Sequence, residues 1–90
     1  MLDPVNSGQF KKDAQIMQRR GKDMAKLREV IDLITAEQPL PPKYRNHGLY
    51  GNWAGKSECH IQGDWVLIYR IDPAAKIVVF HRTGTHSDLF

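Results

Sequence analysis

The last ten residues of this 90-residue chain combine side chains that could act on a nucleic acid. They include two imidazoles, a guanidinium and a terminal phenyl ring, at His81, His86, Arg82 and Phe90. Histidine transfers protons near neutral pH, arginine matches two phosphate oxygens, and an aromatic ring can stack on a base. Chain ends usually fray and tolerate most residues, so this composition favours a functional segment. The alternative interpretation is a polar tail that follows the last strand.

Cleavage of RNA is the chemistry that these residue types fit best. The substrate carries its own nucleophile, the 2′-hydroxyl, so the protein must remove that proton, protonate the leaving 5′-oxygen and stabilise the crowded phosphorus. Aromatic rings can hold a splayed base beside the reacting atoms. The candidate proton-transfer and phosphate-binding residues are His47, His60, Asp64, Arg82 and His86, and the candidate RNA-binding aromatic residues are Trp65, Tyr69 and Phe90.

Other chemistries have weaker support in the sequence. The spacings of the four histidines match no zinc template, and Cys59 points to the opposite side of its strand from His60. Ser57, Ser87 and Cys59 lie in no nucleophile elbow. No glycine-rich loop precedes a helix, so there is no nucleotide-binding fingerprint. We therefore expect neither a metal nor a cofactor.

Two helices are predicted in the first half of the chain. Ser7 precedes apolar residues at helical spacing, and Gly21 can end that helix in the left-handed conformation. Asp23 can cap a second helix, which three prolines between positions 39 and 42 terminate. A short link makes the two helices antiparallel neighbours. The apolar stripe of the second helix is Met24, Leu27, Val30, Ile31 and Ile34.

Three strands are predicted after a long loop at Tyr44–Gly55, over Lys56–Ile61, Trp65–Ile71 and Lys76–Arg82. Tight turns at Gln62-Gly63 and at residues 72–75 would join them. Such pairing predicts a row of His60, Trp65 and Arg82 across one side of the sheet. The helices would then cover the other, apolar side, which consists of Cys59, Ile61, Val66, Ile68, Ile77 and Val79. A register slip of one residue would exchange the two sides of a strand.

Length and composition indicate one small domain over residues 1–90. Thirteen Lys and Arg against ten Asp and Glu give a net charge of +3, which suits nucleic acid or an acidic protein partner. A single cysteine excludes an internal disulfide and fits a reducing compartment. No segment is typical of a signal peptide or a membrane span, so a soluble cytoplasmic protein without membrane association is expected.

Three blocks of the sequence resemble the YafQ-type branch of the RelE superfamily, the toxins of bacterial toxin–antitoxin pairs. They are Tyr44-x-x-His47-x-Leu49-x-Gly51-x-Trp53, then Cys59-His60-Ile61 with Asp64-Trp65-Val66-Leu67-Ile68-Tyr69, and Arg82-Thr83-Gly84-Thr85-His86-x-x-Leu89-Phe90. The resemblance covers nearly the whole chain. It implies an α+β fold in which two N-terminal antiparallel helices pack on a twisted, mostly antiparallel sheet of about four strands. Pro4 leaves the presence of a first edge strand open.

The resemblance also implies an activity and partners. The family consists of ribosome-dependent endoribonucleases that enter the A site and cut translated mRNA, and a cognate antitoxin neutralises them. The toxin–antitoxin complex commonly binds operator DNA through the antitoxin. The family's functional positions correspond to His47, His60, Asp64, Arg82, His86 and Phe90, and less securely to Trp65 and Tyr69.

The expected mechanism is metal-independent attack by the 2′-hydroxyl, with His86 as the general acid and Asp64 or His60 as the base. His47 would assist at the phosphate or the 2′-oxygen, and Arg82 would stabilise phosphate charge. His81 is expected to face the helices as a polar strand-end residue. Two alternatives remain open: a toxin of this fold that acts on DNA gyrase, and a non-catalytic RNA-binding module.

Overall fold

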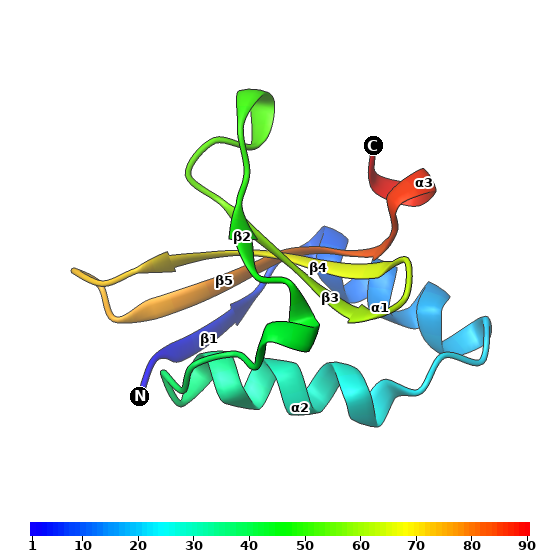
Figure 1. Cartoon of the computed structure of the whole chain (residues 1–90), viewed down its shortest axis with the longest axis horizontal. Helices are drawn as coiled ribbons and strands as arrows, with labels where there is room; N and C mark the ends of the chain where they lie inside the picture. The colour runs from blue at the N-terminus through cyan, green and yellow to red at the C-terminus, as the bar shows by residue number, and fades with distance from the viewer.

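The computed structural model describes residues 1–90 and has an α+β architecture (Figure 1). Its elements are β1 (Asp3–Asn6), α1 (Gly8–Arg19), α2 (Met24–Thr35), β2 (His47–Gly48), β3 (Ser57–Gln62), β4 (Trp65–Asp72), β5 (Ile77–Thr85) and α3 (His86–Leu89), with single 3₁₀ turns η1 at Pro42–Tyr44 and η2 at Gly51–Trp53. Helices α1 and α2 cover one face of the sheet, whereas α3 and the segment around η2 rise from the other (Figure 1). We call this second face the histidine face, because His47, His60 and His86 surround Glu58 on it.

The two long helices begin and end where their capping residues predict. The Ser7 hydroxyl accepts the Phe10 N–H at 3.0 Å, and the Asp23 carboxylate accepts the Ala25 N–H at 3.1 Å. Gly21 follows α1 with φ = 79°, the left-handed conformation that glycine adopts without strain. The two predicted helices are therefore confirmed, whereas the third helix, the short α3 at the end of the chain, is not predicted from the sequence.

The sheet has five strands in the order β1-β5-β4-β3-β2, whereas the sequence pattern predicts three and the resemblance implies about four. It is mixed, because β1 runs parallel to β5 while the other neighbours are antiparallel. The first edge strand is present despite Pro4, since an edge strand needs hydrogen bonds on one side only. The second edge is the two-residue β2, which carries His47.

The predicted strand register is wrong by one residue in the first hairpin. The turn is Gly63-Asp64 with Gly63 at φ = 56°, and an irregularity between His60 and Gln62 places His60 opposite Val66. A one-residue slip exchanges the faces of a strand, so Trp65 lies on the side opposite His60. In the second hairpin Tyr69 pairs with Phe80, two residues from the predicted partner, and an irregularity beside Ile68 adds one residue, so Trp65 lies opposite Thr85 instead of Arg82. The predicted row of His60, Trp65 and Arg82 therefore does not form.

Burial of the large aromatic side chains explains this register. The helix-covered core takes from the sheet Cys59, Ile61, Trp65, Leu67, Tyr69, Val78 and Phe80. Trp65 is 1% exposed, and its indole N–H donates to the Thr83 hydroxyl at 2.9 Å. Burying an indole and satisfying its one donor stabilises this pairing more than burying Val66 in the same position would. Val66 and Ile68 instead form the buried floor of the histidine face.

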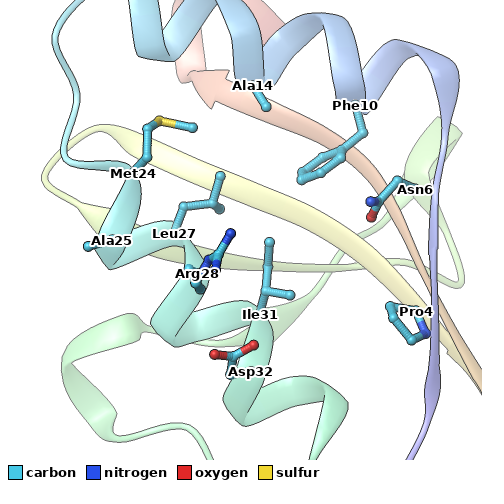
Figure 2. Close-up of a pocket in the computed structure, with 10 residues that line it drawn as sticks. All are labelled: Pro4, Asn6, Phe10, Ala14, Met24, Ala25, Leu27, Arg28, Ile31 and Asp32. Atoms are coloured by element: carbon cyan, nitrogen blue, oxygen red, sulfur yellow. The ribbon is translucent and has the colours of Figure 1, made fainter.

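An apolar groove of about 700 Å³ opens between α1, α2 and β1 (Figure 2). Phe10, Leu27 and Ile31 point into it, with Arg28 and Asp32 at its polar side. The groove contains no histidine and lies on the helix side of the sheet, away from the candidate proton-transfer residues. No helix of the structure is long and apolar enough to cross a membrane.

Candidate active site

Glu58 is the centre of the histidine face. Its side chain is 4% exposed, and its Oε1 atom lies 3.2 Å from His47 Nε2, 3.4 Å from His86 Nε2 and 3.7 Å from His60 Nε2. A buried carboxylate requires opposite charge or hydrogen bonds to offset its lost hydration. Three imidazoles from three separate segments of the chain supply this compensation, and they are thereby held around one point.

The strand pattern explains how two of the imidazoles reach Glu58. Glu58 and His60 are two residues apart in β3, so their side chains project from the same face. His47 pairs directly with Glu58 across the β2–β3 ladder. Cys59 points the other way into the core, where burial and the Glu58 charge raise the pKa of its thiol to about 12. Cys59 is therefore a packing residue and not a nucleophile.

The third imidazole comes from the C-terminal helix. His86 is the first residue of α3, and its Nδ1 atom lies 3.0 Å from the Asp64 carboxylate in the β3–β4 turn. The hydrogen bond to Asp64 raises the pKa of His86. Burial opposes this effect, and the charge of Glu58 adds a smaller contribution that raises the pKa. This shift favours the protonated form of His86, which a general acid requires.

Hydrogen-bond partners distinguish the three imidazoles chemically. His60 Nδ1 lies 3.0 Å from the Gly63 carbonyl oxygen, which can only accept, so Nδ1 carries the hydrogen. Its Nε2 atom, 3.7 Å from Glu58, makes no hydrogen bond and can take up a proton. His47 and His86 differ, because both ring nitrogens of each face an acceptor oxygen. Full satisfaction of these two rings requires hydrogen on both nitrogens.

The capping interactions of α3 fix the position of His86. The Thr85 hydroxyl accepts the Asp88 N–H, and the Asp88 carboxylate accepts the Thr85 N–H, which forms a capping box. Arg20, just after α1, donates to both oxygens of Asp88 at 2.8 and 3.1 Å. The Arg20 contact and the Thr85 bonds hold the pKa of Asp88 well below its usual range. A four-residue helix at the end of the chain is thereby anchored.

Aromatic rings border the imidazoles on the solvent side. The Phe90 ring stacks on His86 at a centroid distance of 5.6 Å and meets the edge of Trp53 at 5.8 Å. Phe90 is 57% exposed, so part of its surface is free to contact a base. Lys56 Nζ lies 6.0 Å from the Trp53 ring centroid.

Arg82 is held by a carboxylate of helix α1. Its Nε donates to the Asp13 carboxylate at 2.7 Å and its Nη2 donates at 3.2 Å. The Asp13 hydrogen bond raises the pKa of Arg82, so the guanidinium stays charged. Asp13 is 5% exposed and also accepts the Thr83 N–H, so it orients the guanidinium rigidly. The structure does not bring Arg82 into direct contact with the three imidazoles.

Trp65 and Tyr69 are not available as RNA-binding rings. Both belong to the helix-covered core, with 1% and 4% exposure, and the Tyr69 hydroxyl donates to Asn46. The expectation that His81 faces the helices is also wrong. His81 is the extra residue of the β5 irregularity between Phe80 and Arg82, and its pKa is lowered by burial and then by the charges of Lys56 and Arg70.

Sequence reasoning missed Glu58, Asp13 and Trp53. The signal for Glu58 was its spacing of two from His60 in a predicted strand, which places an acid and an imidazole on one face. Asp13 gave no signal, because its partner is 69 residues away along the chain. Trp53 appeared in the family-like motif around His47 but had no predicted contact.

The site also contains donor atoms that could hold a metal ion. One ligand atom from each of His47, Glu58 and His60 lies within 4.8 Å of the other two. Two imidazole nitrogens and a carboxylate oxygen are ligands that Zn²⁺ and Cu²⁺ accept. The sequence spacings excluded only the regular zinc templates, whereas this set is assembled across the β2–β3 ladder.

Comparison with known proteins agrees with this geometry. The family model described as the bacterial toxin of type II toxin–antitoxin system, YafQ, matches residues 2–90. The mRNA interferase toxin YafQ of Escherichia coli K12 is 45% identical over 85 residues, which cover 93% of this chain and 90% of that protein.

Two solved structures are similar over the full length of this chain. The crystal structure of the E. coli DinJ–YafQ complex contains a chain of 43% identity with a TM-score of 0.89, and the match covers 99% of that chain. The metal-bound toxin from Helicobacter pylori is 38% identical with a TM-score of 0.94, and all of it is covered. The resemblance inferred from the three sequence blocks is thus confirmed, and this chain belongs to the YafQ family of toxins from bacterial type II toxin–antitoxin systems.

Proposed function

We propose that this toxin is an endoribonuclease that cleaves translated mRNA without a metal ion. The observation that carries the proposal is the convergence of His47, His60 and His86 on the Glu58 carboxylate, beside the exposed Phe90 ring. This arrangement offers a proton acceptor, a proton donor and positive charge within one small region, which is what 2′-hydroxyl attack on a phosphodiester requires. The similarity to an mRNA interferase of E. coli supports the same substrate.

The free Nε2 atom of His60 supports His60 as the base rather than Asp64, the other candidate from the sequence. His60 Nε2 takes the proton of the 2′-hydroxyl, and the 2′-oxygen forms a bond to phosphorus. The bond from phosphorus to the 5′-oxygen breaks, and His86 Nε2–H protonates the leaving oxygen. The products are a 2′,3′-cyclic phosphate and a 5′-hydroxyl end.

The remaining residues support these two proton transfers. Asp64 holds His86 protonated through the 3.0 Å contact to Nδ1, and Glu58 orients all three imidazoles. His47 assists at the phosphate by exchanging its Nε2 contact with Glu58 for a phosphate oxygen. Arg82 adds charge through Nη1, which Asp13 does not engage. Phe90 stacks on a base or packs against its sugar, with Trp53 as its support.

The shape of the site favours a substrate that is already held in place. The largest groove lies on the other side of the sheet, and the pocket beside His60 is only about 260 Å³. A shallow site cannot by itself unstack and orient a flexible strand. We therefore propose that the ribosomal A site presents the mRNA. By analogy with the DinJ–YafQ complex, a cognate antitoxin binds the toxin and carries any contact with operator DNA.

The decisive test is mapping of 5′-hydroxyl ends after expression of the toxin, with and without translation of the same message. We expect cuts at codon positions only when the message is translated, and none with His86→Ala. The variant must remain folded by circular dichroism. DNA damage without such ends would indicate an action on gyrase, and RNA binding without cleavage would indicate a non-catalytic module.

A further inference from the structure

Three basic side chains lie beside the catalytic cluster on three neighbouring strands. Lys56 directly precedes β3, Arg70 is in β4 and His81 is in β5. Ser57 pairs with Tyr69, so extension of that ladder by one residue sets Lys56 opposite Arg70. Alternation along β3 places Lys56 on the same face as Glu58. Arg70 pairs with Val79, two residues before His81 in β5.

No acidic side chain neutralises this basic cluster. Every ion pair of the structure involves other cations, and neither Lys56 nor Arg70 takes part in one. Asp72, next on the same face of β4, accepts the Ala75 N–H within its own turn. Cations that cluster without an acidic partner repel one another, so the arrangement is more favourable with an anion bound.

His81 is the third basic residue of this region and differs from the other two in the burial of its ring nitrogen. The His81 Nε2 atom is buried and has no hydrogen-bond partner. Buried polar nitrogens are almost always satisfied, so an unpartnered one requires an explanation. Burial lowers the pKa of His81, and the charges of Lys56 and Arg70 lower it further. Because His81 Nε2 is buried, a phosphate at this surface would accept from Lys56 and Arg70 and not from His81.

The position of the cluster relative to the scissile phosphate defines which anion fits. Lys56 is two residues from Glu58 along the strand direction, which is about 6.6 Å. Successive phosphates of an extended RNA strand are separated by a comparable distance. Trp53 connects the two regions, because its ring lies near Lys56 on one side and against Phe90 on the other. A base that follows the scissile phosphate would thus meet an aromatic ring.

We propose that Lys56 and Arg70 form a backbone subsite that binds the phosphate adjacent to the scissile one in mRNA. The inference rests on the proposed function and assigns a second contact to the same substrate. Phosphate contacts fix the register of a nucleic acid without reading its sequence. The subsite would therefore position the 2′-hydroxyl opposite His60 whichever codon is present.

The test compares Lys56→Gln/Arg70→Gln with Lys12→Gln/Arg19→Gln, an equal loss of charge at exposed positions of α1. Cleavage of mRNA on programmed ribosomes is followed at several salt concentrations. For the first variant we expect kcat/KM to fall by roughly tenfold at low salt, through KM and not kcat, since neither residue transfers a proton. The ratio of variant to wild type should rise toward one as salt increases, whereas the α1 control should match wild type throughout.

A charge-conserving variant, Lys56→Arg/Arg70→Lys, should restore most of the lost affinity. The subsite is refuted if the first variant cleaves like the α1 control at all salt concentrations. It is also refuted if that variant loses only antitoxin affinity, which would assign the cluster to a protein partner. Absence of cleavage by the wild-type toxin would instead refute the proposed function itself.

Discussion

At the scale of single residues, the site depends on one buried carboxylate surrounded by three imidazoles. Glu58 Oε1 lies within 3.2 to 3.7 Å of each of the three Nε2 atoms, and each imidazole has a different second partner. A carbonyl oxygen beside His60 leaves its Nε2 free, whereas a carboxylate beside His86 raises the pKa of that ring. Three chemically identical side chains can therefore perform different steps of one reaction.

The contact between Asp64 and His86 makes a prediction about pH. A general acid must be protonated, so activity falls as pH rises through the pKa of His86. Because the Asp64 hydrogen bond is the largest cause that raises this pKa, Asp64→Asn should lower it and move the alkaline loss of kcat to lower pH. A pH–rate profile of kcat measures the shift, and NMR titration of His86 is the direct check. An unmoved alkaline limb would remove Asp64 from this role.

The donor set of His47, Glu58 and His60 makes a prediction about metal ions. If His60 Nε2 is the base, a metal on that nitrogen blocks proton uptake, so Zn²⁺ or Cu²⁺ should inhibit cleavage. A chelator should leave cleavage by the metal-free toxin unchanged, provided the ribosomes keep their Mg²⁺. Stimulation by Zn²⁺, or loss of activity with a chelator selective for transition metals, would contradict the metal-independent mechanism.

At the scale of elements, the decisive feature is the short helix α3, which carries His86 and ends next to Phe90. It is only four residues long and depends on its capping box and on Arg20. An isolated helix of this length is unstable in water. The site is therefore complete only where α3 docks on β5 beside the end of α1.

Gly84 allows this docking, and its substitution tests it. A Cβ atom at position 84 would lie 3.2 Å from both Cβ and Oδ2 of Asp88, which is closer than ordinary contacts. We expect Gly84→Ala to displace α3, lower kcat and weaken amide-exchange protection over residues 86–90, with a small effect on global unfolding. The control is Gly8→Ala, where a Cβ meets no atom within 4 Å. Wild-type activity of Gly84→Ala would show that the position of α3 is not critical.

At the scale of the whole molecule, the sheet separates a core face from a reactive face. Trp65 was expected among the RNA-binding residues but belongs to the core, with its indole donor satisfied by Thr83. The helices bury the large aromatic side chains on one side, which leaves the other side to the ionisable groups. Tests at Trp65 must therefore distinguish a role in folding from a role in catalysis.

Substitution of Trp65 should affect stability and not the chemical step. Loss of a fully buried aromatic side chain costs about 3–5 kcal/mol, a large share of the stability of a small domain. Trp65→Ala should therefore lower the midpoint of urea unfolding strongly. Trp65→Phe keeps most of the apolar volume, so it should fold and retain kcat on programmed ribosomes. A folded Trp65→Phe variant with greatly reduced kcat would return this ring to the active site.

Local patterns in the sequence were sufficient for much of this protein. Helix caps at Ser7 and Asp23 and the apolar stripe of α2 depend on residues within one or two turns, so the helices could be predicted. The three long strands and the histidine set were likewise readable from residue types and from the family-like blocks. These are short-range properties, and no distant contact alters them.

Only the tertiary structure decided which side of each strand faces the helices. One extra residue between His60 and Gln62 exchanges the faces of β4, and its cost is offset by burying Trp65 against residues far away in the chain. The same holds for Glu58 and Asp13, whose partners lie up to 70 residues away. Side chains alternate between the two faces along every strand. Which residues face the helices depends on the packing energy of the whole core, and no local segment of the sequence determines that energy.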